Sequence, residues 1–572
     1  MLSKETRRSK KYMNRNTELH FSNVPKIHLK RSKFDMSNSY KTTFNTGDIV
    51  PIYTDADITP GDTVTMDMAE VVRMATPLYP VMDNLTLDIM WFFVPHRLVW
   101  EHWREFWGEN DDPWTQTTEY EIPKIKAPSG GWAKGTIADY MGVPTYVDNL
   151  GGLDDNGVAK GINALPFRAY AKIFNDWFRD ENLKSNCNIY KDETTRTGSN
   201  GTTYVTDVEK GGMPAKAAKT HDYFTSALPT PQKGPAVNIP LGTVAPVKTR
   251  TTEILGKGTP LHWTNAGTGA AEVPGTGYQY NLGLAQNGDT AKFPHTPLDD
   301  EYRLYPNNLY ADLAGATAST IAQLRTSFAI QKFYEQAGRN GSRYTEFLRS
   351  VFGVESSDAR IQRSEYLGGT RIPINIDQVL QTSSTDAVSP QGNTGAFSCT
   401  INRDNMFTKS FEEHGTLMCM AIVRVTHRTY QQGLKRMWTR SKWVDFYNPY
   451  FAHLSEQPIR NDQIYAQGNA SDEAVFGYQE AWADYRYKEN IVTGAMRSNT
   501  PGGGLDSWHY ADDYNTLPTL TGTWIDEPTS NVDRTIAVQS QIENQFIADF
   551  YFKTAYTRVM PVYSIPGLID HV

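Results

Sequence analysis

The sequence predicts a mainly β protein in which two antiparallel sheets pack face to face, with long helical and loop segments inserted between strands. Strand patterns fall into an early group, at about 45–95, and a late group, at about 370–565. Neither group has enough strands for a sandwich, whereas together they give about eight. The strands also do not alternate with helices, as those of a doubly wound parallel sheet do. We therefore expect both ends of the chain to build one sandwich, spanning 34–572 with its insertions.

The composition of this 572-residue chain agrees with a β core, because aromatic residues make up 12% of it and mean hydropathy is −0.53. It contains no run of about 18 apolar residues, and its N-terminus lacks the apolar segment of a secretory signal, so we expect no membrane insertion. Three scattered cysteines suit a reducing cytoplasm and are expected to be small buried apolar residues: Cys187, Cys399 and Cys419.

The early strands are marked by alternation and by turn residues. Ile49 to Tyr53 is a short strand, Pro60-Gly61 a turn, and Thr63 to Met74 a strand with one apolar face. The stretch NLTLDIMWFFVP from Asn84 to Pro95 begins half-exposed and ends with apolar residues on both faces, which predicts a strand that becomes fully buried.

Helical patterns fill the space between the two strand groups. The segment from Val99 to Trp107 is predicted to be a short Trp-rich helix within a helical insertion at about 96–184. A second helix there starts after Asn163, with Pro166 in its first turn, and its apolar residues recur at helical spacing through Phe178. The Gly- and Thr-rich region at about 185–300 is predicted to be a surface insertion, and a helical segment follows at about 310–353.

The late strands complete the set. Gly368-Gly369 is predicted to be a turn before an alternating strand through Ile372 and Ile376, and Leu417 to Tyr430 reads as a long apolar strand. In the last strand, Ile542 to Met560, one face carries the apolar side chains Phe546, Ala548, Phe550 and Phe552.

Charge is distributed unevenly along the chain. Residues 1–33 carry ten basic and two acidic side chains, a net charge of +8, and because the whole chain carries −8 the remaining residues carry −16. A flexible basic arm on an acidic body is typical of proteins that neutralise the phosphates of single-stranded DNA, with Tyr12, Phe21 and Phe34 available to stack on bases. The alternative is a solvated tail that binds nothing, and we favour nucleic acid on electrostatic grounds. The candidate DNA-binding residues are Arg7, Arg8, Lys10, Lys11, Arg15, Lys26, Lys30, Arg31 and Lys33.

Four segments resemble a known family: RSKFDMSNSYKTTFNTGDIVPIYTDADITPGDTVTMDM, FFVPHRLVWEHWREFWGEN, SEYLGGTRIPINIDQV and FYFKTAYTRVMPVYSIPGLIDH. In this order they are similar to the major capsid proteins of gokushoviruses, small single-stranded DNA bacteriophages of the microvirus family. The resemblance runs from about residue 30 to the C-terminus and is weakest through 185–300 and 500–535.

The resemblance implies an eight-stranded viral jelly roll whose copies form a T=1 icosahedral shell around a circular single-stranded DNA genome. It further implies an internal scaffolding protein, a DNA pilot protein, a host surface receptor, and assembly in the bacterial cytoplasm. In that family a large insertion forms protrusions at the threefold axes, and we expect it at about 185–300.

Other functions find less support in the sequence. It has no HExxH, GxSxG or GxxxxGK[ST] motif, so we expect no enzyme and name no catalytic residue. Adjacent carboxylates at Asp111-Asp112, Asp154-Asp155 and Asp299-Asp300-Glu301 leave a divalent cation at subunit contacts open, but solvated loops explain them equally and no cofactor or metal residue is assigned. The alternative function is a secreted β-sandwich carbohydrate-binding protein or glycosidase.

Overall fold

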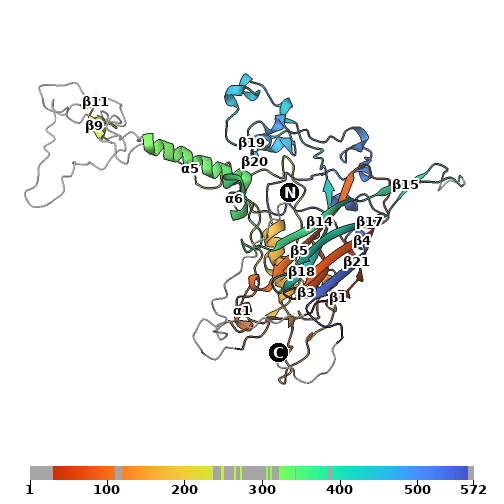
Figure 1. Ribbon diagram of the computed structural model, residues 1–572. Coiled ribbons are helices and arrows are strands. Elements are labelled where there is room, and N and C mark those ends of the chain that lie inside the picture. The colour runs from red at the N-terminus through yellow and green to blue at the C-terminus, as the bar shows by residue number, and fades with distance from the viewer. Residues whose placement is uncertain are drawn as a thin grey trace, which may run out of the picture. The chain divides into compact units, whose positions relative to one another are not determined.

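The computed structural model describes residues 30–109, 119–235, 237, 247–249, 263–265, 271–272, 304–306, 309–311, 321–341, 343–383, 385 and 390–563 (Figure 1). The chain divides into two compact units. The main unit comprises Met1–Pro231 with Gly338–Val572, and the second unit comprises Gln232–Ala337.

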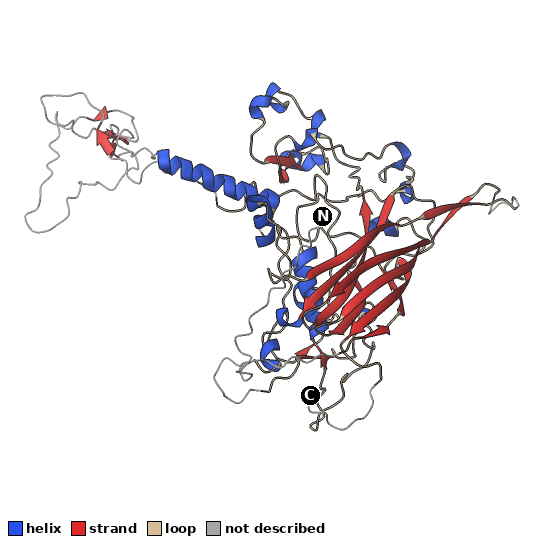
Figure 2. Ribbon diagram, in the orientation of Figure 1, coloured by secondary structure: helices blue, strands red, loops and turns tan. Residues whose placement is uncertain are grey.

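Two antiparallel sheets form the sandwich of the main unit (Figure 2). The first sheet has the order β1-β21-β4-β17, and β2 pairs with β21 beside β1. Its strands are β1 (Ser32–Asp35), β2 (Asn38–Phe44), β4 (Thr63–Met74), β17 (Thr400–Ser410) and β21 (Phe546–Arg558). The second sheet has the order β14-β5-β18-β3, with β3 (Val50–Ile58), β5 (Asn84–Pro95), β14 (Glu365–Pro373) and β18 (Gly415–Thr426).

Because β1 and β2 pair with successive stretches of β21, the two sheets have eight strand positions. The predicted eight-stranded jelly roll with insertions is therefore confirmed. Each sheet combines strands from early and late in the sequence, as in the pairing of β4 with β17 and β21.

The first core lies between the sheets and follows the predicted alternation. In β21 the side chains of Phe546, Phe550 and Phe552 are buried, and in β4 every second side chain from Val64 to Met74 is buried. Trp91 of β5 is fully buried and lies against the rings of Tyr53, Phe407 and Phe552 at centroid distances of 5.2, 5.4 and 5.8 Å. The core therefore joins side chains from both sheets.

A second core covers the other face of the second sheet. α3 (Leu165–Ile173) continues into a π-helical turn (Phe174–Phe178) and packs with Phe92 and Val94 of β5 and with Met418, Met420 and Ile422 of β18. The predicted N-cap, Asn163, lies one residue before the observed N-cap Ala164, although its Oδ1 accepts a hydrogen bond from Leu165 N at 2.9 Å. The prediction that β5 ends buried on both faces is confirmed.

Several predictions were wrong in detail. Gly368-Gly369 is not a turn but part of β14, where a bulge separates Tyr366 from Gly368. A Cβ on Gly369 would lie 2.3 Å from Ile89 O, so this residue must be glycine because β5 approaches it closely. The Trp-rich helix is limited to α1 (Trp103–Phe106), after a 3₁₀ turn at His96–Leu98.

The start of the predicted surface insertion also needs correction. Cys187, Val208, Ala215 and Ala217 are buried in the second core, because the segment up to Pro231 packs within the main unit. The second unit is Gln232–Ala337, and most of the predicted region beyond residue 235 lies outside the described residues.

The remaining elements are short or peripheral. In the main unit they are α2 (Ile137–Tyr140), α4 (Tyr204–Asp207), α6 (Tyr344–Phe352), α7 (Ser530–Asp533), β6 (Lys124–Lys126), β7 (Ile162–Asn163), β8 (Arg196–Thr197), β15 (Ile376–Leu380), β16 (Thr394–Ser398), β19 (Gln457–Arg460) and β20 (Val475–Gln479). The second unit has β9 (Val247–Thr249), β10 (Trp263–Asn265), β11 (Ala271–Glu272), β12 (Leu304–Pro306) and β13 (Leu309–Ala311), and α5 (Ile321–Asn340) runs from it into the main unit.

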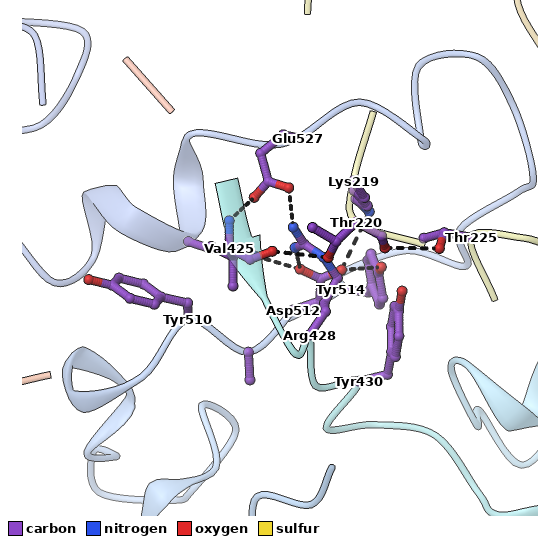
Figure 3. A network of polar contacts seen from close by, with 12 residues as sticks. Lys219, Thr220, Thr225, Val425, Arg428, Tyr430, Tyr510, Asp512, Tyr514 and Glu527 are labelled. Atoms are coloured by element: carbon purple, nitrogen blue, oxygen red, sulfur yellow. Dashed lines mark hydrogen bonds and ion pairs between the residues drawn. The ribbon is translucent and has the colours of Figure 1, made fainter. Parts of the chain in front are cut away.

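A buried ion network holds the end of β18 to two long connecting segments (Figure 3). Arg428 is fully buried and contacts Asp512 at 2.6 Å and also Glu527, while Lys219 lies 3.4 Å from Asp512. Tyr514 donates a hydrogen bond to Asp512 at 2.8 Å. The two cations and two carboxylates balance, and burial of each depends on the others.

The same network perturbs the pKa of its members. Burial alone would raise the pKa of Asp512, but Arg428 and Lys219 outweigh it and hold that pKa well below its usual range. Burial lowers the pKa of Lys219. Asp512 therefore stabilises the fold in its ionised form.

We predict that Asp512→Asn lowers the free energy of unfolding by about 3–5 kcal/mol at pH 7, because it leaves buried cations uncompensated. The folded-state pKa of Asp512 is depressed, so its contribution is present above the unfolded value of about 3.9 and is lost as pH falls below it. The free energies of unfolding in urea, measured from pH 7 to pH 3, should differ less between wild type and variant at acid pH.

The matched control is Asp513→Asn, because Asp513 is exposed and its side chain accepts a hydrogen bond from Gln432. It should change stability by less than about 0.5 kcal/mol. If the difference in free energy of unfolding between wild type and Asp512→Asn stays constant down to pH 3, ionised Asp512 does not stabilise the fold as described.

Candidate nucleic-acid interface and assembly surfaces

The outward face of the first sheet carries cationic side chains among polar, apolar and acidic ones, the acidic ones including Asp67 and Asp549, and we call it the open sheet face. Arg73 of β4, Arg403 of β17 and Lys553 of β21 are exposed and make no ion pair with the residues that the structure describes. Register places Lys553 beside Asp67 and Tyr551 beside Ala69, which in turn lies beside Arg403. Phosphate groups and a stacked base can both be accommodated on a face of this composition.

The predicted basic arm enters the fold at the edge of this face. Lys33 points outward from β1 and is exposed, and Lys30 is exposed just before it. Arg31 is engaged within the subunit: its guanidinium donates to Gly61 O, to Thr63 Oγ1 at 2.6 Å and to Thr557 O at 3.2 Å. Its structural role is to fix the start of β1 against β21 and β4.

Other arm residues are placed differently from the sequence expectation or lie outside the description. Phe34 pairs with Tyr556 on the inward side of β1 and is half-buried, so it is not available to stack on bases. The remaining predicted DNA-binding residues lie outside the described residues: Arg7, Arg8, Lys10, Lys11, Arg15 and Lys26.

A groove of 1220 Å³ continues the open sheet face at one end. Arg73 and Lys41 line one wall, and Lys134 and Lys216 line the other. Lys216 pairs with Asp48 at 2.6 Å and Lys41 with Asp549 at 3.3 Å, whereas Arg73 and Lys134 have no carboxylate partner in the described part of the chain. Four carboxylates also line the groove, namely Asp48, Asp139, Glu543 and Asp549, so its lining carries no net charge.

The segment 436–454, which follows β18, forms a second kind of surface that we call the aromatic loop. It contains three 3₁₀ turns, and its rings are highly exposed: Trp438 by 70%, Trp443 by 72% and Tyr450 by 94%. Arg440 pairs with Asp484, so this cation is neutralised within the subunit. An exposed aromatic patch of this kind is typical of protein–protein interfaces.

Sequence reasoning missed this surface and favoured other aromatic segments as core or interface. Trp100 and Tyr170 are fully buried, so those segments contribute chiefly to the core, although Trp107 is 60% exposed. The aromatic loop has no helical or strand period to mark it. Its signal was the density of Trp and Tyr between charged residues.

The structure offers little support for a metal site. Among the described residues no group of three His, Cys, Asp or Glu side chains is arranged to hold an ion. Asp154 Oδ1 instead accepts from Asn156 N and Val158 N at 2.9 and 2.8 Å, and the other two predicted acidic clusters lie outside the described residues. Within the same residues no helix is long and apolar enough to span a membrane.

In comparisons with known proteins, the matching family and the similar relatives are all described as capsid proteins. The family described as "Capsid protein (F protein)" matches residues 22–568. The chain is 42% identical to the capsid protein VP1 of Spiroplasma virus 4 over 98% of this chain and 99% of that protein. It is 40% identical to VP1 of Bdellovibrio phage phiMH2K, over 97% and 98%, and 38% identical to VP1 of Chlamydia phage 1, over 96% and 97%.

We predict that Arg31→Ala speeds amide hydrogen exchange in β1, because it removes three hydrogen bonds that hold the start of this strand. The melting temperature should change little, since Arg31 is exposed. Exchange measured by mass spectrometry over 32–35 provides the test.

Lys33→Ala serves as the control, because Lys33 lies in β1 and its side chain makes no hydrogen bond or ion pair with described residues. Equal exchange rates for Arg31→Ala, Lys33→Ala and wild type would show that Arg31 does not anchor the strand.

Proposed function

The chain belongs to the capsid protein (F protein) family and is a major capsid protein of a gokushovirus-like microvirus, and from this premise we propose how it holds the genome. Copies of the chain assemble into the multimeric shell of the virion, which is a structural role. We propose that the shell is a T=1 icosahedron around circular single-stranded DNA, and that the basic arm is its principal DNA contact. The open sheet face supplies a second, weaker contact.

The observation that carries this proposal is the charge asymmetry of the chain. Residues 1–33 have a net charge of +8, whereas the rest has −16. The acidic body repels a polyanion, so DNA binding concentrates where cations gather. Phosphate neutralisation with counterion release supplies the affinity and requires no base sequence.

The open sheet face supports the proposal because the arm joins it at β1. A DNA strand that leaves the basic arm can pass Lys33, Lys553 and Arg403 on the outward face of the sheet, where Tyr551 is also exposed. The apolar part of the tyrosine ring offers a stacking surface.

The remaining partners follow from family membership and belong to the proposal. They are an internal scaffolding protein, a DNA pilot protein and a host surface receptor. We also propose that the second unit, Gln232–Ala337, forms the protrusion at the threefold axis. A secreted carbohydrate-binding protein or glycosidase is not favoured, because the matching relatives are all named capsid proteins over nearly their whole length.

We predict that replacing Arg7, Arg8, Lys10 and Lys11 by Gln lowers the DNA content of purified particles. Each lost phosphate contact reduces the salt dependence of single-stranded DNA binding by about 0.7 in the log–log slope, so the four together reduce it by up to about 3. The measurements are the absorbance ratio of particles and binding to an oligonucleotide over a salt series.

A charge-matched control compares Arg7→Gln/Arg8→Gln with Lys160→Gln/Lys488→Gln, whose exposed side chains make no ion pair with described residues. Only the arm pair should lose DNA. Unchanged genome content in the fourfold arm variant refutes the proposed role of the arm.

We predict a smaller effect for the open sheet face. Arg403→Gln/Lys553→Gln should reduce the slope of the salt dependence by at most about 1.4, because only two phosphate contacts are lost. Assembly should be retained, since both side chains are exposed on a sheet whose core they do not touch. A slope equal to that of Lys160→Gln/Lys488→Gln would remove this face from the interface.

A further inference from the structure

A cavity of 400 Å³ in the main unit has a strongly cationic lining. It lies where the end of α3 and its π turn meet the start of α6 and the segment 361–363. The ionisable groups of its wall are five cations and one carboxylate, namely Lys172, Arg179, Lys191, Arg343, Arg363 and Asp176. The wall therefore carries a net charge of +4.

The donors of this wall are satisfied largely by neutral acceptors. Arg343 Nη2 donates to Arg179 O at 2.8 Å and to Asn175 O at 3.3 Å, and Arg363 Nη2 donates to Asp176 O at 2.7 Å. A backbone carbonyl accepts a hydrogen bond but brings no net charge. These contacts fix the guanidinium groups in place without neutralising them.

Several carboxylates lie close to the wall without lining the cavity: Asp180 and Glu181 act on Arg179, and Asp358 acts on Arg363. Asp176 Oδ1 lies 2.8 Å from Lys172 Nζ, and its other oxygen accepts from Ser364. Glu346 lies 3.6 Å from Arg343 and does not line the cavity. Lys191 is exposed and has no ion-pair partner among the described residues.

Without a bound anion, the burial and mutual repulsion of these cations are energetically unfavourable. Burial and the neighbouring Arg343 lower the pKa of Arg179, and Arg179 Nε is buried with no hydrogen-bond partner. Burial also lowers the pKa of Arg363, whose guanidinium lies 3.6 Å from the centre of the Trp177 ring. Rigid, partly desolvated cations of one sign form a preorganised anion site.

The chemistry of the wall distinguishes among anions. Three guanidinium groups offer paired N–H donors that match the oxygens of a phosphate, and the first turn of α6 adds Tyr344 and Thr345 to the same wall. The Tyr344 ring is 66% exposed at the rim, where it can cover a sugar or base attached to the phosphate.

We propose that this cavity is a phosphate-binding site of the folded subunit. It takes a phosphate group, either free or as part of a nucleic-acid backbone. The proposal goes beyond the role assigned to the arm, because the cavity lies wholly in the main unit and binds its ligand without the arm.

The test uses full-length protein with Arg7, Arg8, Lys10 and Lys11 replaced by Gln, so that the arm does not contribute. Isothermal titration with inorganic phosphate, at constant ionic strength in chloride, should show one site per subunit. Arg179→Gln/Lys191→Gln in this background should weaken binding at least tenfold, and Lys160→Gln/Lys488→Gln should leave it unchanged. Lys191→Gln alone, at an exposed side chain, should weaken binding without altering the melting temperature.

A competition experiment identifies the source of the phosphate. If a short oligothymidylate displaces inorganic phosphate, the site takes a nucleic-acid phosphodiester, and if it does not, the site takes a free or terminal phosphate. The absence of saturable phosphate binding, or equal phosphate binding by Arg179→Gln/Lys191→Gln and its parent, would each overturn the proposal.

Discussion

Burial of both faces of the second sheet is the constraint on which the main unit depends. Alternate residues of β5 serve two cores, since Trp91 faces the first sheet and Phe92 faces the helical insertion. β18 is divided in the same way, with Cys419 on one side and Met420 on the other. Without α3 the outer side of this sheet would expose a continuous apolar surface. The insertion is therefore part of the fold, and among the described residues it covers the outer face of the second sheet while the outer face of the first sheet stays exposed.

Local patterns predicted much of this fold, and long-range contacts account for the failures. Thr63–Met74 was predicted with the bounds it has in the structure, because its alternation of apolar and polar side chains is a local signal. Gly368-Gly369 was misread as a turn because these positions are glycine for long-range reasons: Met406 O lies close to Gly368 and Ile89 O lies close to Gly369. The arm could be recognised by charge alone. The cationic cavity could not, because its residues are spread from Lys172 to Arg363 without a shared motif.

The protein treats buried and surface charge in opposite ways. In the Arg428 network every cation is paired with a carboxylate of the same subunit, and these ion pairs join three segments of the chain. On the open sheet face and in the cationic cavity some cations, such as Arg403, Lys553 and Lys191, have no ion-pair partner among the described residues, and these remain available to ligands. In the aromatic loop Arg440 is neutralised by Asp484, which leaves rings to make contacts that salt hardly affects.

The position of β21 at the centre of the first sheet has a consequence for synthesis of the chain. Tyr556 donates to Asp55 at 2.6 Å across 501 residues, and β21 supplies pairing partners for β1, β2 and β4. A nascent polypeptide on the ribosome cannot complete this sheet until almost all of it has been translated, and loop closure over such a separation is slow. Products of premature termination lack the central strand. A truncated chain without β21 therefore cannot complete the first sheet, and we expect it to be excluded from assembly with full-length subunits.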